Sequence, residues 1–112
     1  MAVVTNKPVR VSRHILDGLG LGGYFSLVLG GDSTARKKPH PDPVLQALAH
    51  LHVSQPAAAV MIGDSANDIF AGRSAGLMTC GVPSNIGDAV QLRQSFPDFL
   101  VLNTLELTRL FN

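Results

Sequence analysis

The segment VMIGDSAND at residues 60–68 of this 112-residue chain is the most informative about its fold. An apolar run ends in Gly63 and Asp64, and a second aspartate, Asp68, follows four residues later, where a helical pattern begins. Runs that are apolar at successive positions are typical of parallel strands buried on both faces. Functional groups in open α/β sheets collect beyond the carboxyl ends of such strands. We therefore expect Asp64 at a strand end and Asp68 about one helical turn later, on the same side.

Similar short apolar runs recur along the chain, and longer amphipathic segments separate them. Because such runs are too short for helices and several carry β-branched residues, strands are predicted at residues 2–5, 25–29, 58–62, 78–82 and 100–102. Helices are predicted at residues 8–19, 42–51, 67–75, 88–94 and 104–111, with Pro8 and Pro43 at first helical positions and Asp42 as an N-cap. This alternation predicts an α/β sheet with right-handed crossovers.

The composition excludes several classes of protein. Apolar residues make up 46% of the chain and charged residues 15%, which is typical of one folded domain rather than a disordered segment. A net charge of +1 argues against binding to nucleic acid, and no apolar run is long enough to cross a membrane. No signal peptide is visible, and the single cysteine, Cys80, cannot form an internal disulfide, so a cytoplasmic protein is expected.

Asp64 and Asp68 are the strongest candidates for chemistry. Two carboxylates at a strand end suit Mg²⁺, which accepts one or two carboxylates, several waters and a substrate phosphate. The alternative is purely structural: Asp64 caps the helix, and Asp68 adds a first-turn charge that the helix dipole favours. The spacing alone leaves both interpretations open.

Two further segments carry candidate phosphate ligands. Thr5 and Asn6 follow the first predicted strand, where a hydroxyl, an amide and free backbone N–H groups could bind a phosphate oxygen. Lys38 lies in RKKPHPDP, residues 36–43, where three prolines fix an extended loop and the ammonium could neutralise a phosphate and a nearby carboxylate. The alternatives are an ordinary helix cap for the first segment and a solvated basic turn for the second. Residues 30–32 are interpreted as a turn.

Taken together, the motifs resemble those of haloacid dehalogenase superfamily phosphatases, most closely the phosphoglycolate phosphatase branch. The resemblance implies that Thr5, with Asn6, binds the transferring phosphoryl group and that Lys38 steadies the nucleophile and the phosphate. It also implies that Asp64 and Asp68 surround Mg²⁺, with Asp64 catalytic alongside Lys38. A small phosphorylated metabolite is then the expected substrate. The implied fold is a partial Rossmann-like three-layer sandwich with a mostly parallel sheet.

The family's nucleophile motif, Asp-x-Asp-x-Thr, has no match, because no two aspartates of this sequence lie two residues apart. The resemblance therefore implies a single, incomplete core domain over residues 1–112 that lacks the cap and the central first strand, and no turnover by this chain alone. Without that strand, two groups of strands would face each other with unpaired edges, so self-association is an expected hazard. A non-catalytic phosphate- or Mg²⁺-binding module stays open, as do dehalogenase and phosphomutase activities.

Overall fold

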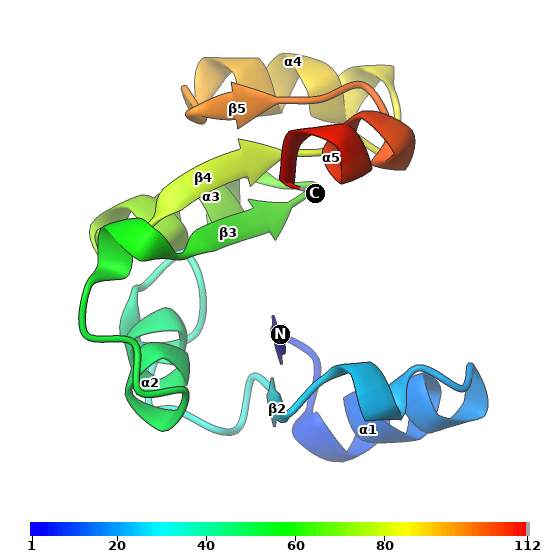
Figure 1. The fold of residues 1–112 in the computed structure, drawn as a ribbon, viewed down its shortest axis with the longest axis vertical. Coiled ribbons are helices and arrows are strands. Elements are labelled where there is room, and N and C mark those ends of the chain that lie inside the picture. Colours follow the sequence, from blue (N-terminus) through cyan, green and yellow to red (C-terminus); the bar gives the residue numbers. More distant parts are fainter. Residues whose placement is uncertain (112) are drawn as a thin grey trace.

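In the computed structural model, which describes residues 1–111, strands and helices alternate along the chain (Figure 1). The strands are β1 (Ala2–Val4), β2 (Leu27–Leu29), β3 (Val60–Gly63), β4 (Met78–Gly81) and β5 (Phe99–Leu100). The α-helices are α1 (Val9–Gly18), α2 (Asp42–His50), α3 (Ala66–Ser74), α4 (Ile86–Gln94) and α5 (Thr104–Phe111). The predicted α/β fold is confirmed, although β5 begins and ends earlier than expected. Asn112, the last residue of the predicted domain, lies outside the described residues.

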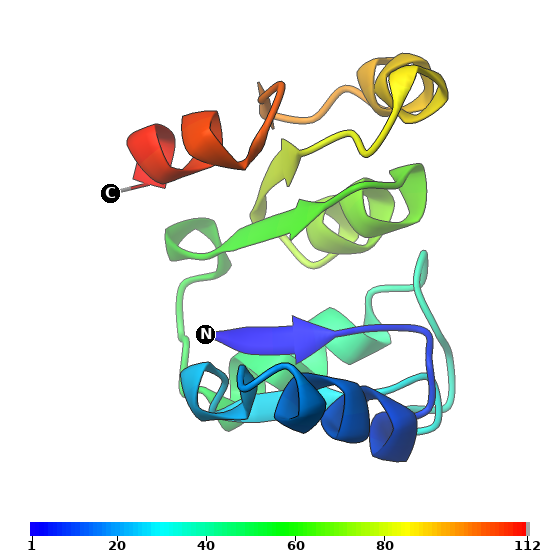
Figure 2. The ribbon, with the colours of Figure 1, turned by 90° about the vertical axis from the view of Figure 1, so that its right-hand side faces the viewer.

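The strands form two sheets rather than one. β1 pairs in parallel with β2, while β3, β4 and β5 form a second parallel sheet in that order. β1 and β3 are therefore both edge strands, and Figure 2 shows that they point in the same direction. This is the interrupted sheet that the sequence led us to expect.

Helix α2 joins the two sheets. It packs on β1, β2 and α3, and Figure 1 shows α1 and α2 on opposite sides of the β1–β2 sheet. A buried cluster contains Val44 of α2, Met61 of β3, Ala71 of α3 and Ala75, the C-cap of α3, with Val4 of β1 packed against it. The apolar core is thus continuous through α2 although the backbone pairing is interrupted.

An open cleft of about 550 Å³ separates β1 from β3. The side chains that line it are all apolar: Met1, Ala2, Val3, Val4, Phe25, Val60, Met61 and Ile62. A second apolar cleft of about 210 Å³ adjoins it on the side of α2, where Val44, Leu48 and Val53 contribute to the lining. We call the first cleft the interstrand slot.

Two helix starts differ from the prediction. Pro8 is the N-cap of α1 rather than its first residue, and Pro41 rather than Asp42 is the N-cap of α2. The carboxylate of Asp42 instead accepts a hydrogen bond from Arg36 Nε at 3.2 Å and lies 3.1 Å from His40 Nδ1. The side chain expected to cap the helix is therefore engaged by the preceding loop.

Cys80 of β4 is completely buried, and this burial raises the pKa of the thiol, which stays protonated at neutral pH.

Within residues 1–111, none of the helices combines the length and the apolarity that crossing a membrane requires.

Candidate active site

Asp64 directly follows β3, as predicted, and its side chain is exposed. Its Oδ2 accepts a hydrogen bond from Ser84 Oγ at 3.1 Å, and Ser84 lies in the loop between β4 and α4. Asp64 does not cap α3, because Ser65 is the N-cap residue. The interpretation of Asp64 as a helix cap is wrong.

Asp68 is almost completely buried in the first turn of α3, and both of its carboxylate oxygens accept hydrogen bonds. Oδ2 accepts from the backbone N–H of Ser65 at 3.3 Å and from its hydroxyl at 3.1 Å, in a capping box. Oδ1 lies 2.5 Å from Lys38 Nζ. Asp68 thus has a structural role in the helix and also holds the lysine.

Lys38 crosses from the loop before α2 to the end of β1. Its ammonium donates to the backbone carbonyl of Val4 at 2.8 Å and to Asp68, and the side chains of Lys38 and Asp68 are each only 9% exposed. The interpretation as a solvated basic turn is therefore wrong. The buried ammonium of Lys38 therefore lies between the end of β1 and the start of α3, and it links the two sheets.

Thr5 and Asn6 follow β1, on the loop that leads to α1. Thr5 Oγ1 accepts a hydrogen bond from the backbone N–H of Lys7 at 3.2 Å, and Asn6 Nδ2 donates to the backbone carbonyl of Lys38 at 3.2 Å. Neither side chain caps α1, so the interpretation as an ordinary cap is also wrong. The Thr5 hydroxyl accepts in this bond and keeps its own proton for another acceptor, whereas Asn6 anchors the lysine loop.

The turn after β2 supports the loop that carries Thr5 and Asn6. The sequence did not indicate this contact. Gly31 N–H donates to the carbonyl of Lys7 at 2.8 Å, and Asp32 Oδ1 accepts from the N–H of Val9, the first residue of α1, at 2.8 Å. Residues 30–32 do form a turn, as predicted. These hydrogen bonds hold in place the loop between β1 and α1, which carries the candidate phosphate ligands Thr5 and Asn6.

Gly30→Ala is expected to disturb this support. A Cβ at Gly30 would overlap backbone atoms of Lys7 and Val9, which cannot move aside as a flexible side chain does. Displacing the loop is expected to lower the free energy of unfolding by about 1–3 kcal/mol, measured by urea denaturation. Gly23→Ala is the matched control, because nothing lies within 4 Å of its added Cβ. Equal stability of the two variants would contradict this account of the turn.

The residues present fit a magnesium ion. Mg²⁺ binds through one or two carboxylates and fills its remaining positions with water and phosphate oxygens, so it does not need a cage of protein ligands. No cluster of three or more His, Cys, Asp or Glu side chains suited to a metal occurs within residues 1–111. Asp64 is exposed at a strand end, and of its two oxygens Oδ2 bonds Ser84, which leaves Oδ1 for a cation.

The first 82 residues, which include every site residue predicted from the sequence, match the family described as Haloacid dehalogenase-like hydrolase. The chain belongs to this family. The resemblance inferred from the motifs is therefore confirmed, and the parallel α/β arrangement agrees with it.

Three relatives illustrate the similarity. A phosphoglycolate phosphatase from Pectobacterium atrosepticum is 44% identical to this haloacid dehalogenase-like chain over 103 residues, covering 90% of the chain and 43% of the relative. One from Aquifex aeolicus is 40% identical over 112 residues, covering 100% and 51%. The crystal structure of a predicted phosphoglycolate phosphatase from Haemophilus somnus superposes with a TM-score of 0.87 at 35% identity, covering 99% and 49%. The chain spans about half the length of the curated relatives it matches.

Proposed function

We propose that this chain supplies the phosphate- and Mg²⁺-binding part of a phosphomonoester hydrolase. The observation that carries the proposal is the position of Lys38, whose buried ammonium lies between the carbonyl of Val4 and the carboxylate of Asp68. A cation that is fixed where two strand ends approach each other is suited to stabilising the negative charge on a phosphoryl group during its transfer. The similarity to phosphoglycolate phosphatases supports the same class of reaction.

Each side chain has a proposed part in binding the phosphate. The Thr5 hydroxyl and backbone N–H groups of its loop donate to phosphate oxygens, while Asn6 keeps the lysine loop in place through the carbonyl of Lys38. Lys38 offers positive charge from the other side. Asp64 would bind Mg²⁺ directly. Asp68, which the resemblance also assigns to the metal, would contribute instead through its hold on Lys38 and Ser65, because both of its oxygens already accept hydrogen bonds. When bound, the metal supplies charge neutralisation of the phosphate oxygens.

Turnover by this chain alone is not expected. In the family an aspartate attacks phosphorus, and a second aspartate two residues later transfers the proton. No pair of aspartates with that spacing occurs among the 112 residues. The chain's residues can bind and orient a phosphate but provide no matching nucleophile.

The proposed substrate class is a small phosphorylated metabolite. Phosphoglycolate is the first compound to test, because the names of the relatives carry it. We place the protein in the cytoplasm, where a free thiol such as that of Cys80 stays reduced.

The test combines binding and catalysis on the same chain. We expect orthophosphate to shift the amide resonances of Thr5, Asn6 and Lys38 in NMR titrations, and to do so more strongly with Mg²⁺ present. Hydrolysis of phosphoglycolate and p-nitrophenyl phosphate should stay at the background rate. Absence of any phosphate-dependent shift would contradict the proposed site. Robust hydrolysis that Asp64→Asn abolishes would instead contradict the predicted inactivity.

A second candidate function is a non-catalytic phosphate- or Mg²⁺-binding module. The absence of paired aspartates favours it, because binding needs no nucleophile. Adding a synthetic peptide with the family's Asp-x-Asp-x-Thr pattern after an apolar strand separates the two functions. Phosphatase activity that appears only with that peptide supports the hydrolase, whereas phosphate binding without activity supports the binding module.

A further inference from the structure

Asp64 and Asp68 are held in very different ways. The carboxylate of Asp68 is almost completely buried, and Lys38 and Ser65 fix both of its oxygens. Asp64 is exposed beyond the end of β3, where an unrestrained side chain exchanges between rotamers within nanoseconds. A metal ligand that moves in this way loses conformational entropy each time it binds an ion, so its affinity depends on what restrains it.

The hydroxyl of Ser84 supplies such a restraint. Its Oγ donates to Asp64 Oδ2 at 3.1 Å, across 20 residues of sequence. Ser84 follows β4, on one side of β3, whereas Thr5 and Asn6 follow β1, on the other side of the interstrand slot. The hydroxyl therefore engages one oxygen of Asp64 from outside the candidate phosphate site and leaves Oδ1 for a cation.

The loop that carries Ser84 is short and is fixed at both ends. β3 and β4 end side by side, and the N–H of Val82 donates to the carbonyl of Gly63 at 2.9 Å. At the other end of the loop, Asn85 is the N-cap of α4, and its side chain accepts from the N–H of Asp88 at 2.9 Å. These bonds hold the loop without the serine hydroxyl, so the loop does not need that hydroxyl to keep its shape.

We propose that Ser84 is a positioning residue for the metal site: its hydroxyl holds the Asp64 carboxylate in the observed rotamer, with Oδ1 available to Mg²⁺. The role rests on the proposed function, in which Asp64 is the metal ligand. Carboxylates that bind metals are themselves hydrogen-bonded, and loss of the supporting group weakens metal binding by about 10–100-fold. The contact between Ser84 and Asp64 is exposed, and water competes for the same oxygen, so a loss at the lower end of this range is expected.

Ser84→Ala is expected to weaken binding of Mg²⁺ to the full chain by about tenfold in the presence of orthophosphate. NMR titration of the Gly63 and Ser65 amides with MgCl₂ measures the affinity. Ser84→Thr keeps a hydroxyl and is expected to keep the affinity. Ser26→Ala is the matched control, because it removes an exposed hydroxyl that donates to the carbonyl of Met1 instead. Circular dichroism should give all three variants nearly the same melting temperature as the unchanged chain.

A second measurement reports on the side chain of Asp64 without the metal. Three-bond NMR couplings between its α and β protons give the populations of the rotamers. We expect one dominant rotamer in the unchanged chain and in Ser84→Thr. In Ser84→Ala, we expect couplings averaged over several rotamers, because the carboxylate has lost the hydroxyl that restrains it.

The outcomes distinguish failure of this role from failure of the proposed function. If Asp64→Asn weakens Mg²⁺ binding and Ser84→Ala does not, Asp64 stays the ligand and Ser84 does not position it. Unchanged Asp64 couplings in Ser84→Ala, or equal weakening by Ser84→Ala and Ser26→Ala, would overturn the role of Ser84 as well. If the unchanged chain shows no MgCl₂-dependent shift, the proposed metal site is wrong, and the role of Ser84 fails with it.

Discussion

Replacing Lys38 with methionine is expected to lower the free energy of unfolding by about 3–5 kcal/mol, measured by urea denaturation. The variant leaves the Asp68 carboxylate almost buried, with hydrogen bonds from Ser65 as its remaining partners. It also leaves the carbonyl of Val4 without the ammonium that it contacts. Removing one partner of a buried ion pair is costly because the other charge stays in a poorly hydrated place.

Two further variants make the result interpretable. Lys37→Met changes the neighbouring, exposed lysine and is expected to alter stability by no more than about 0.5 kcal/mol. The double variant Lys38→Met/Asp68→Asn removes both charges and is expected to recover much of the loss, since no uncompensated charge stays buried. If Lys38→Met were no more destabilising than Lys37→Met, the lysine would not link the two sheets.

Asp64→Asn is expected to weaken Mg²⁺ binding by about 100-fold or more in the presence of orthophosphate. Loss of a residue that only supports a metal ligand already weakens binding by about 10–100-fold, so loss of a charged ligand itself should cost at least as much. NMR titration of the Gly63 and Ser65 amides with MgCl₂ measures the affinity. The stability of the variant should change by less than about 0.5 kcal/mol, because the exposed carboxylate bonds Ser84 at the surface.

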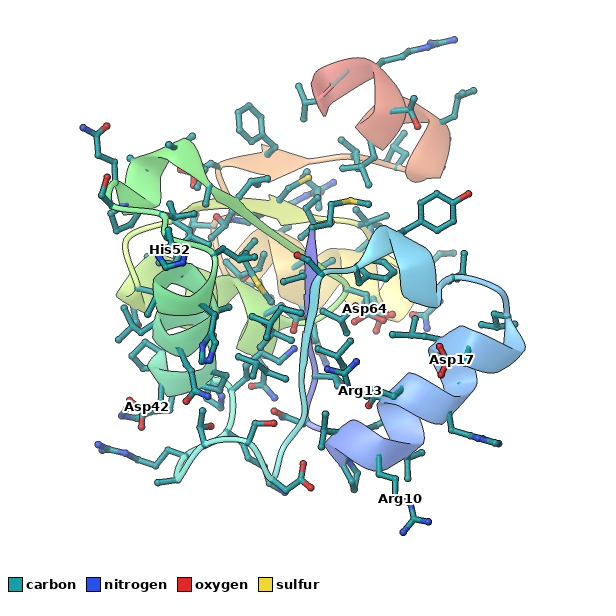
Figure 3. All side chains as sticks on the ribbon, turned by 60° about the horizontal axis from the view of Figure 1, so that its bottom comes forward. Arg10, Arg13, Asp17, Asp42, His52 and Asp64 are labelled. Carbon is teal, nitrogen blue, oxygen red and sulfur yellow. The ribbon has the colours of Figure 1, made fainter. Side chains whose placement is uncertain are left out.

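Asp17→Asn serves as the control for this prediction. Asp17 is an exposed carboxylate on α1, an element separate from the strand end that carries Asp64 (Figure 3). The substitution removes the same net charge and should leave Mg²⁺ affinity nearly unchanged. Equal weakening by both variants would indicate a general effect of charge, and unchanged affinity in Asp64→Asn would remove Asp64 from the metal site.

The order of strands and helices could be predicted because local patterns determine it. Apolar runs such as residues 60–63 and 78–81 fit strands buried on both faces, and Gly76 after α3 has a φ of +89° that favours glycine at a helix end. The helix starts at Pro8 and Asp42 were less accurate. At the start of α1, a distant residue competes with the local capping preference, because Asp32 bonds Val9 across 23 residues of sequence. At the start of α2, the preceding loop engages the side chain of Asp42 instead.

The candidate site was predictable only in part. Spacing placed Asp64 at a strand end and Asp68 one helical turn later. It could not show that Lys38, 30 residues away from Asp68 in sequence, pairs with that carboxylate. Ser84 was missed altogether, because a serine in a polar loop has no pattern that signals a partner at another strand end. Such pairings depend on how the elements pack, and only the complete fold reveals them.

The division of the sheet also has a consequence for the way the chain folds. Each half is built from its own continuous stretch: β1, α1 and β2 precede residue 30, and β3, α3, β4 and β5 follow residue 59. Contacts within each stretch are close in sequence, so each half can form early with little loss of chain entropy. We expect docking of α2 and burial of the Lys38 ammonium to follow. The halves are therefore expected to open separately in native-state hydrogen exchange, as two cooperative units held together by a single helix and one buried ammonium.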